Sequence, residues 1–215
     1  LSVEHAVYIA IELCKGLDYA HRRTNDDGRP LGVVHRDVSP PNVLVSMEGE
    51  IKITDFGIAK AAHKLGTTEA GVVKGTFGYM SPEQVRGLPV DHRTDIFSTG
   101  ILLHEMLTGR RLFTGANDLE AIERVKATHV PAPSSVNRAV PGSIDPIVFR
   151  ALAKDPADRY ASANELQLAL SRFLFTGGAG ASASSLAGYM AELFGDDGAD
   201  HGGPEEEILY SALDA

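Results

Sequence analysis

Apolar residues recur at three- and four-residue steps over residues 2–21, beginning with Val3, Ala6 and Val7. This spacing puts them on one face of a helix, so it predicts an amphipathic helix whose apolar face is buried. The polar stretch that follows, 24–32, contains Asn, Asp, Gly and Pro, which favour turns. We therefore expect the first helix to end near residue 21 and a loop to follow it.

A different kind of pattern follows further along the chain. The β-branched residues Val43 and Val45, and then Ile51 and Ile53, alternate on either side of a turn at 47–50. Alternation about a short turn predicts a β-hairpin. The next segment, 55–83, has few core-type residues and several Gly and Thr, so we expect a mobile loop there.

A second helical pattern, over residues 94–108, is apolar around most of its circumference. Its large apolar residues are Ile96, Phe97, Ile101, Leu102, Leu103, Met106 and Leu107. A helix of this kind cannot lie on a surface, so the pattern predicts a buried helix at the centre of the domain. Shorter helices are predicted between proline-containing joints at three places: 119–128, 145–153 and 162–173.

The composition changes after the last of these helices. Residues 174–184 are rich in Gly, Ala and Ser, which is linker composition. Residues 185–194 carry apolar residues at helical spacing and predict one more amphipathic helix, whereas 195–215 are acidic and Gly-rich and predict a disordered tail. Residues 1–173 are thus expected to form one domain. A solvated linker and tail is the favoured interpretation of the rest, and docking on a partner or back on the domain is the alternative.

The overall composition, 43% hydrophobic and 23% charged over 215 residues, is typical of a globular protein. The formal net charge is −9, but seven acidic residues and no Lys or Arg lie from residue 196 onward, so the body is nearly neutral. Nucleic-acid binding needs a basic surface, so we expect no nucleic-acid partner. We also expect no membrane segment in this chain, because no apolar run approaches about 20 residues. A lone cysteine, Cys14, fits a reducing compartment, and we expect a cytoplasmic protein.

Two short motifs carry the candidate chemistry. They are H-R-D with an Asn five residues later, and D-F-G thirteen residues after that Asn: His35-Arg36-Asp37, Asn42 and Asp55-Phe56-Gly57. Phosphoryl transfer needs a carboxylate close to the attacking hydroxyl, and Asp37 can supply it. Magnesium needs hard oxygen ligands. Asn42 and Asp55 can supply these, because the hairpin between them brings the ends of the segment together.

The order and spacing of these motifs resemble the signature set of the eukaryotic-type serine/threonine protein kinases, and most closely the bacterial, Hanks-type members. Later segments extend the resemblance over residues 2–173. Residues 75–83 resemble the peptide-binding loop and A-P-E motif, with Ser81 in place of Ala, and 91–100 resemble the start of the buried kinase helix. Residues 155–160 contain an Arg where the family has one.

The resemblance implies a role for each matching residue. The catalytic set would be Asp37 with His35, Arg36, Ser39 and Thr76. ATP and Mg²⁺ would be the cofactors, bound at Asn42, Asp55, Phe56 and Gly57, with Asn42 and Asp55 as the metal ligands. The structural residues would be Asp95, which hydrogen-bonds the catalytic-loop backbone, and the ion pair of Glu83 with Arg159. A surface ion pair worth little is the alternative for that pair.

The same resemblance suggests the substrate class and a mode of regulation. Thr76 implies Ser and Thr hydroxyls, rather than phenols, as acceptors. Arg36 beside Asp37 can clamp a phosphate group, so phosphorylation in the following loop is expected to regulate activity, with Thr67 and Thr68 as the candidate sites. Both could instead be merely polar loop residues.

Two departures from the family pattern change the prediction. Most serine/threonine kinases have Lys two positions after the catalytic Asp, whereas this chain has Ser39, which carries no charge. No Gly-rich phosphate loop or strand Lys lies among the 34 residues before the H-R-D motif. The predicted fold class is therefore mainly α (α+β): a helical kinase C-lobe with a short β-hairpin and the N-lobe absent. Such a fragment would be close to inactive by itself.

We therefore predict the catalytic lobe of a protein serine/threonine kinase that transfers the γ-phosphate of ATP to protein hydroxyls. The alternative is a pseudokinase or docking scaffold without catalysis. The intact set Asp37, Asn42 and Asp55 favours the kinase, because a scaffold has no chemical need of all three. Ser39 and the early position of the motif favour the scaffold.

Overall fold

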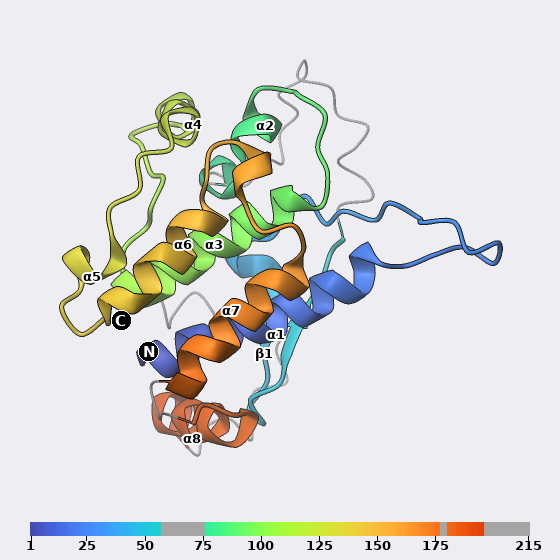
Figure 1. Cartoon of the computed structure of the whole chain (residues 1–215). Coiled ribbons are helices and arrows are strands. Elements are labelled where there is room, and N and C mark those ends of the chain that lie inside the picture. The colour runs from blue at the N-terminus through green and yellow to red at the C-terminus, as the bar shows by residue number, and fades with distance from the viewer. Residues whose placement is uncertain (57–75, 177–179, 196–215) are drawn as a thin grey trace.

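The long first helix, α1 (Val3–His21), shows why the chain folds as its apolar pattern predicts. The Ser2 hydroxyl caps it by accepting a hydrogen bond from the His5 N–H (3.2 Å). Its buried face includes Ala6, Val7 and Leu17, as the spacing predicted. The computed structural model describes residues 1–56, 76–176 and 180–195. Within these residues, α1 packs mainly on α7 (Ala163–Thr176) and α3 (Arg93–Thr108) (Figure 1).

Helix α3 is the buried helix predicted from its apolar circumference. Residues on several of its faces are inaccessible to solvent, among them Ile96, Phe97 and Leu103. Gly100 on this helix lets helix α6 (Asp145–Ala151) approach closely, because a Cβ there would lie 3.1 Å from the Cβ of Ala151. Gly109 ends α3 in the left-handed conformation at φ 65°, which glycine adopts without steric cost.

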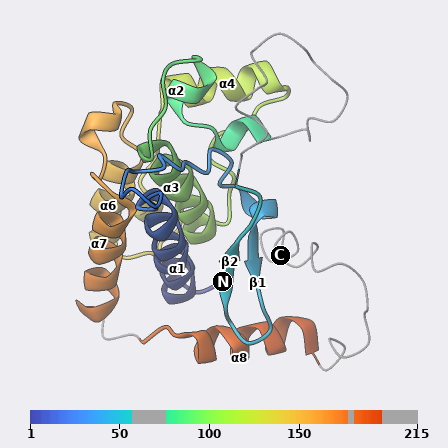
Figure 2. The ribbon, with the colours of Figure 1, turned by 90° about the vertical axis from the view of Figure 1, so that its right-hand side faces the viewer.

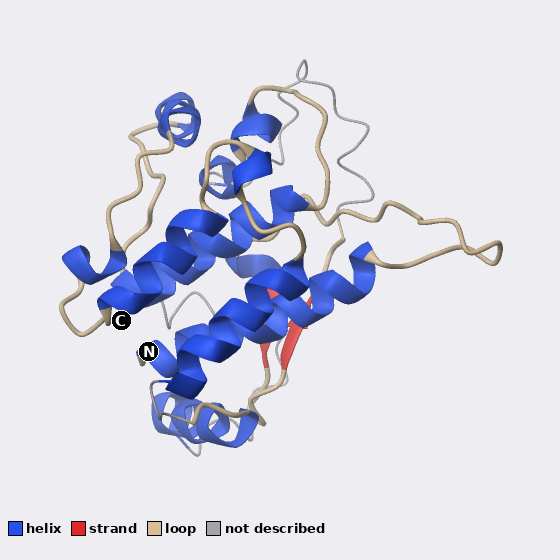
Figure 3. Ribbon diagram, viewed as in Figure 1, coloured by secondary structure: helices blue, strands red, loops and turns tan. Residues whose placement is uncertain are grey.

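The other helices surround this centre (Figure 3). Their bounds are Pro82–Val85 for α2, Asp118–Ala127 for α4, Pro133–Val136 for α5, Asp145–Ala151 for α6 and Ala183–Phe194 for α8. The predicted helices at 119–128, 145–153 and 162–173 correspond to α4, α6 and α7, with ends that differ by at most three residues. None of the helices in the described ranges is both long and apolar enough to cross a bilayer.

Strands β1 (Val43–Val45) and β2 (Ile51–Ile53) form the predicted hairpin. They are antiparallel, with Val43 opposite Ile53 and Val45 opposite Ile51. Helix α8 runs across the turn of this hairpin (Figure 2), where a Cβ on Gly49 would lie 2.0 Å from the Ala183 carbonyl oxygen. Leu186 and Met190 of α8 are buried against the same core as α1 and the hairpin.

The predicted fold class, a mainly α lobe with the N-lobe absent, is wrong as a description of this chain. The described residues contain an antiparallel sheet over 43–53, in which β2 contacts α1, together with the helices. The prediction of an absent lobe rested on the position of the H-R-D motif near the first residue. The distance of a motif from the first residue of a sequence does not determine which parts the fold contains. We therefore do not describe a lobe as absent.

Several predictions concern segments that lie partly or wholly outside the described residues. The predicted loop 55–83 includes 57–75, and the predicted linker includes 177–179. The predicted tail from residue 196 onward is also outside.

Candidate active site around the catalytic loop

The backbone of the catalytic loop is held by a buried carboxylate from the first turn of α3. Asp95 accepts hydrogen bonds from the His35 N–H and the Arg36 N–H, both at 2.8 Å. His21 at the end of α1 donates a third, through Nε2 at 2.7 Å. Arg36 has φ 67°, a left-handed conformation that costs a non-glycine residue free energy unless its surroundings impose it. Asp95 provides one such restraint.

His35 connects the catalytic loop to the strand that leads to the D-F-G motif. Its ring is fully buried. Nε2 lies 2.7 Å from the Thr54 carbonyl oxygen, which can only accept, so Nε2 donates. Nδ1 accepts from the Asp37 N–H at 3.2 Å. The ring also packs on Phe56, with centroids 4.6 Å apart, so two of the predicted site residues are in contact.

Asn42 links the predicted catalytic carboxylate to the predicted metal site. Its Nδ2 group donates to the backbone oxygen of Asp37 at 2.7 Å and to Asp37 Oδ2 at 3.1 Å. Ser39 is also buried, and its hydroxyl lies 3.5 Å from the same Asp37 carbonyl. The loop therefore folds around Asp37, and the position where the family usually has Lys holds a buried, uncharged hydroxyl.

The hairpin brings Asn42 and Asp55 to the same end of the sheet. The Thr54 N–H donates to the Asn42 carbonyl at 2.9 Å, which extends the β1–β2 ladder by one step. Asp55 follows directly, exposed and with φ 53°. No group of three or more His, Cys, Asp and Glu suited to a metal occurs in the described ranges. One carboxylate and one amide oxygen nevertheless fit Mg²⁺, which commonly takes one or two protein oxygens together with phosphate oxygens and water.

Glu83 and Arg159 form a buried bidentate pair, so the alternative of a surface ion pair does not apply. Arg159 Nη1 and Nη2 lie 2.7 Å from Glu83 Oε1 and Oε2, and the two residues are 2% and 6% exposed. Burial by itself would raise the pKa of Glu83, but the hydrogen bonds and charge of Arg159 outweigh it and hold that pKa below its ordinary value. Thr94 adds a hydrogen bond to Glu83 Oε1 at 3.0 Å.

Three predicted residues cannot be placed. Gly57, Thr67 and Thr68 lie outside the described residues. Thr76 begins the 3₁₀ turn Thr76–Tyr79, which precedes α2.

Two hydrogen-bonded polar residues, of which only the first contacts the catalytic loop, were missed from the sequence. Gln84 Nε2 donates to the Arg36 carbonyl at 2.7 Å. Glu105 is buried in α3 and accepts hydrogen bonds from the Tyr79 hydroxyl (2.7 Å) and the Leu112 N–H (2.9 Å). Burial raises the pKa of Glu105, and these hydrogen bonds oppose the rise. An acidic residue inside a helix apolar on most sides was a usable signal for Glu105, whereas nothing local marked Gln84.

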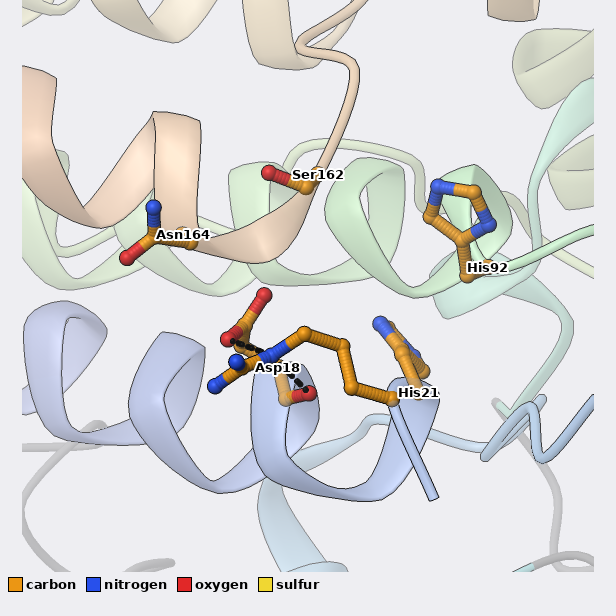
Figure 4. Close-up of a pocket in the computed structure, with 6 residues that line it drawn as sticks. Asp18, His21, His92, Ser162 and Asn164 are labelled. Carbon is orange, nitrogen blue, oxygen red and sulfur yellow. Dashed lines mark hydrogen bonds and ion pairs between the residues drawn. The ribbon is translucent and has the colours of Figure 1, made fainter. Parts of the chain in front are cut away.

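A cleft of about 310 Å³ lies between the end of α1 and the starts of α3 and α7 (Figure 4). Its lining residues are Asp18, His21, Arg22, His92, Ser162 and Asn164. Asp18 and Arg22 are paired with each other at 2.7 Å. None of the predicted catalytic or metal-binding residues lines this cleft, so it is separate from the candidate active site.

Comparison with known proteins shows which family this chain is similar to. The family profile described as "Protein kinase domain" matches residues 1–169. The chain is 40% identical over 189 residues to the tyrosine-protein kinase MasK of Myxococcus xanthus, covering 88% of this chain and 29% of MasK. It is 44% identical over 161 residues to the serine/threonine-protein kinase PknL of Mycobacterium tuberculosis, covering 74% and 38% of the two chains. The chain thus spans well under half the length of these relatives.

A solved structure supports the fold. The crystal structure of the Mycobacterium tuberculosis PknI kinase domain superposes with a TM-score of 0.58 at 27% identity, covering 80% of this chain and 55% of that one. The profile that matches residues 1–169 describes the protein kinase domain as such. This match also corrects the predicted fold class of a C-lobe without its N-lobe. This chain therefore belongs to the protein kinase family, among its bacterial eukaryotic-type members.

Proposed function

We propose that this protein is a serine/threonine protein kinase that transfers the γ-phosphate of ATP to hydroxyl groups of proteins. The observation that carries the proposal is the contact of Asn42 with Asp37, at the end of the hairpin that leads to Asp55. These residues supply a carboxylate for the attacking hydroxyl and oxygen atoms for a metal in one small region. The relatives named as protein kinases support the same activity.

In this proposal Asp37 orients the acceptor hydroxyl and accepts its proton. The Asn42 hydrogen bond to Oδ2 holds the carboxylate in one orientation, and the His35 contact with the Asp37 N–H holds its backbone. Asn42 and Asp55 would hold Mg²⁺, which supplies neutralisation of charge on the phosphates when bound. Phe56 and Gly57 would shape the nucleotide side, and Ser39 would leave the transferring phosphate without the usual Lys charge.

Thr76 supports Ser and Thr as acceptors, through the family resemblance. One relative, MasK, is named a tyrosine-protein kinase, so the acceptor residue has to be measured. We further propose that Arg36 binds a phosphate on Thr67 or Thr68. Its Nε atom is buried and has no hydrogen-bond partner in the described part of the chain, which supports a role for the guanidinium toward a further group.

Residues 1–215 alone should bind ATP weakly. In the described ranges no Gly-rich turn that could cover phosphates follows a strand, and positioning of the nucleotide is a large part of catalysis in this family. A calorimetric titration of ATP with magnesium measures this, and micromolar affinity would contradict it.

Transfer of labelled phosphate from ATP to a protein substrate tests the main proposal. The full-length protein and its Asp37→Asn variant should be compared, followed by phosphoamino acid analysis and mapping of phosphorylated residues. We expect transfer to Ser and Thr by the wild type only, with phosphate on Thr67 or Thr68. Equal signal from both proteins would favour the alternative, a docking scaffold without catalysis. Ser39, in place of the usual Lys, is the residue that supports this alternative.

A further inference from the structure

Gln84, the third residue of α2, makes hydrogen bonds with both ends of its side-chain amide. Oε1 accepts from the Ser81 N–H at 2.9 Å, while Nε2 donates to the Arg36 carbonyl at 2.7 Å. The opposite orientation of the amide would put NH₂ against an N–H and oxygen against a carbonyl. Thr94 Oγ1 also donates to Oε1, at 3.4 Å, and these partners together determine the orientation of Gln84.

The carbonyl that Gln84 contacts belongs to the peptide group between Arg36 and the proposed catalytic base. The N–H of this same peptide group, on Asp37, donates to His35 Nδ1 at 3.2 Å. Arg36 itself is in the left-handed region at φ 67°, and such a conformation persists in a non-glycine residue only where neighbours impose it. Asp95 holds the Arg36 N–H, and Gln84 holds its carbonyl.

The oxygen of the Gln84 amide contacts Ser81, which lies in the segment predicted to contain the peptide-binding loop and A-P-E motif, residues 75–83. Ser81 caps α2 in a capping box with Gln84, and its hydroxyl also contacts Thr94 Oγ1. The neighbouring Glu83 is tied to Arg159, so α2 is fixed to the core. Gln84 thus connects a rigid element on the substrate side to the backbone of Asp37 by one donated hydrogen bond.

We propose that Gln84 is a positioning residue that sets the orientation of the 36–37 peptide group, and with it Asp37, relative to the predicted peptide-binding loop. This inference rests on the proposed kinase function. It predicts a specific chemical requirement: position 84 needs a hydrogen-bond donor as well as an acceptor. The capping box by itself needs only the acceptor, since Glu serves at that position as well as Gln.

The Gln84→Glu substitution separates these two requirements, because it keeps size and capping oxygen and removes the donor. The matched control is Gln167→Glu on α7, whose amide donates to Ser171 on its own helix (3.2 Å). Both variants should be made in the full-length protein and assayed for kcat, KM and thermal midpoint between pH 5 and 8.5, because the ordinary pKa of Glu is about 4.3 and its protonated form becomes appreciable only near pH 5. At pH 8 we expect Gln84→Glu to lower kcat about 10- to 100-fold, the scale of a small misplacement of a reacting group. KM for ATP should stay within about twofold of wild type.

The pH dependence distinguishes positioning from general damage to the fold. A protonated Glu can donate to the Arg36 carbonyl, so the ratio of variant to wild-type kcat should rise as the pH falls. Unchanged kcat at pH 8, a ratio independent of pH, or an equal loss in Gln167→Glu would overturn the proposal.

A second measurement does not depend on activity. Amide hydrogen exchange of the Asp37 N–H, followed by NMR on residues 1–215, should be at least about tenfold faster in Gln84→Glu, because its peptide group has lost the hydrogen bond that Gln84 donates to it. Amides of α7 should not change. An inactive wild type would contradict the proposed function, whereas unchanged exchange at Asp37 would contradict the positioning role of Gln84.

Discussion

Replacing Arg159 by Met should lower the free energy of unfolding by about 3–5 kcal/mol, the usual result of removing one partner of a buried ion pair. Arg159 is 2% exposed and donates two 2.7 Å hydrogen bonds to Glu83. It also donates to the carbonyl oxygens of Ala153 (2.8 Å), Arg93 (3.0 Å) and Lys154 (3.2 Å). The variant therefore leaves a buried carboxylate without its counter-charge and three carbonyls without this donor.

Urea unfolding at pH 7, followed by circular dichroism, measures the change, since the total stability of a domain of this size is about 5–15 kcal/mol. The matched control is Arg124→Met, which removes an exposed pair with Glu120 whose side chains are 55% and 42% exposed. That pair should contribute no more than about 0.5 kcal/mol. A difference between the two variants below about 1 kcal/mol would refute the argument from burial.

The pH dependence identifies the charge as the cause. In the wild type the pKa of Glu83 is held below its ordinary value of 4.5, so its contribution is present above pH 4.5 and is lost as the pH falls through the lower, folded-state pKa. Without Arg159, burial should raise the pKa of Glu83. The variant should therefore lose most free energy of unfolding at pH values at which Glu83 is ionised. The gap in stability between wild type and variant should therefore narrow as the pH falls below 4.5. Adding Glu83→Gln to Arg159→Met should recover part of the loss at pH 7.

Three further predictions concern single residues. Burial lowers the pKa of His104 from its ordinary 6.5, although a hydrogen bond to Pro131 opposes this change. The free energy of unfolding should therefore fall as the pH drops below 6.5. In urea unfolding between pH 7 and 5, His104→Gln should depend less on pH than the wild type. Burial raises the pKa of Cys14, so iodoacetamide at pH 8 should label it at least about 100-fold faster in urea than in the folded protein. Gly49→Ala should cost at least about 1 kcal/mol more than Gly28→Ala in urea unfolding. Both glycines have left-handed φ (78° and 76°), but only at Gly49 would the new Cβ meet α8; equal losses would argue against that contact.

Local pattern was sufficient where one segment determines its own structure. The three- and four-residue spacing in α1 and the apolar circumference of α3 predicted both helices, because a helix places residues three and four apart on one side. Alternation predicted the β1–β2 hairpin for the corresponding reason. The predicted absence of a lobe failed, because it was drawn from the position of a motif and not from the pattern of any segment.

The motifs of the candidate site were also legible in the sequence, because phosphoryl transfer restricts which residue types can serve and the hairpin sets the distance between Asn42 and Asp55. The family resemblance also named Asp95 and the pair of Glu83 with Arg159, 76 positions apart, but only the tertiary structure decided that this pair is buried. The contact of Gln84 with the Arg36 carbonyl, across 48 positions, came from the tertiary structure alone. Such contacts depend on how α2, α3 and the catalytic loop pack together, and a polar residue that is buried only by this packing looks like any exposed polar residue in the sequence.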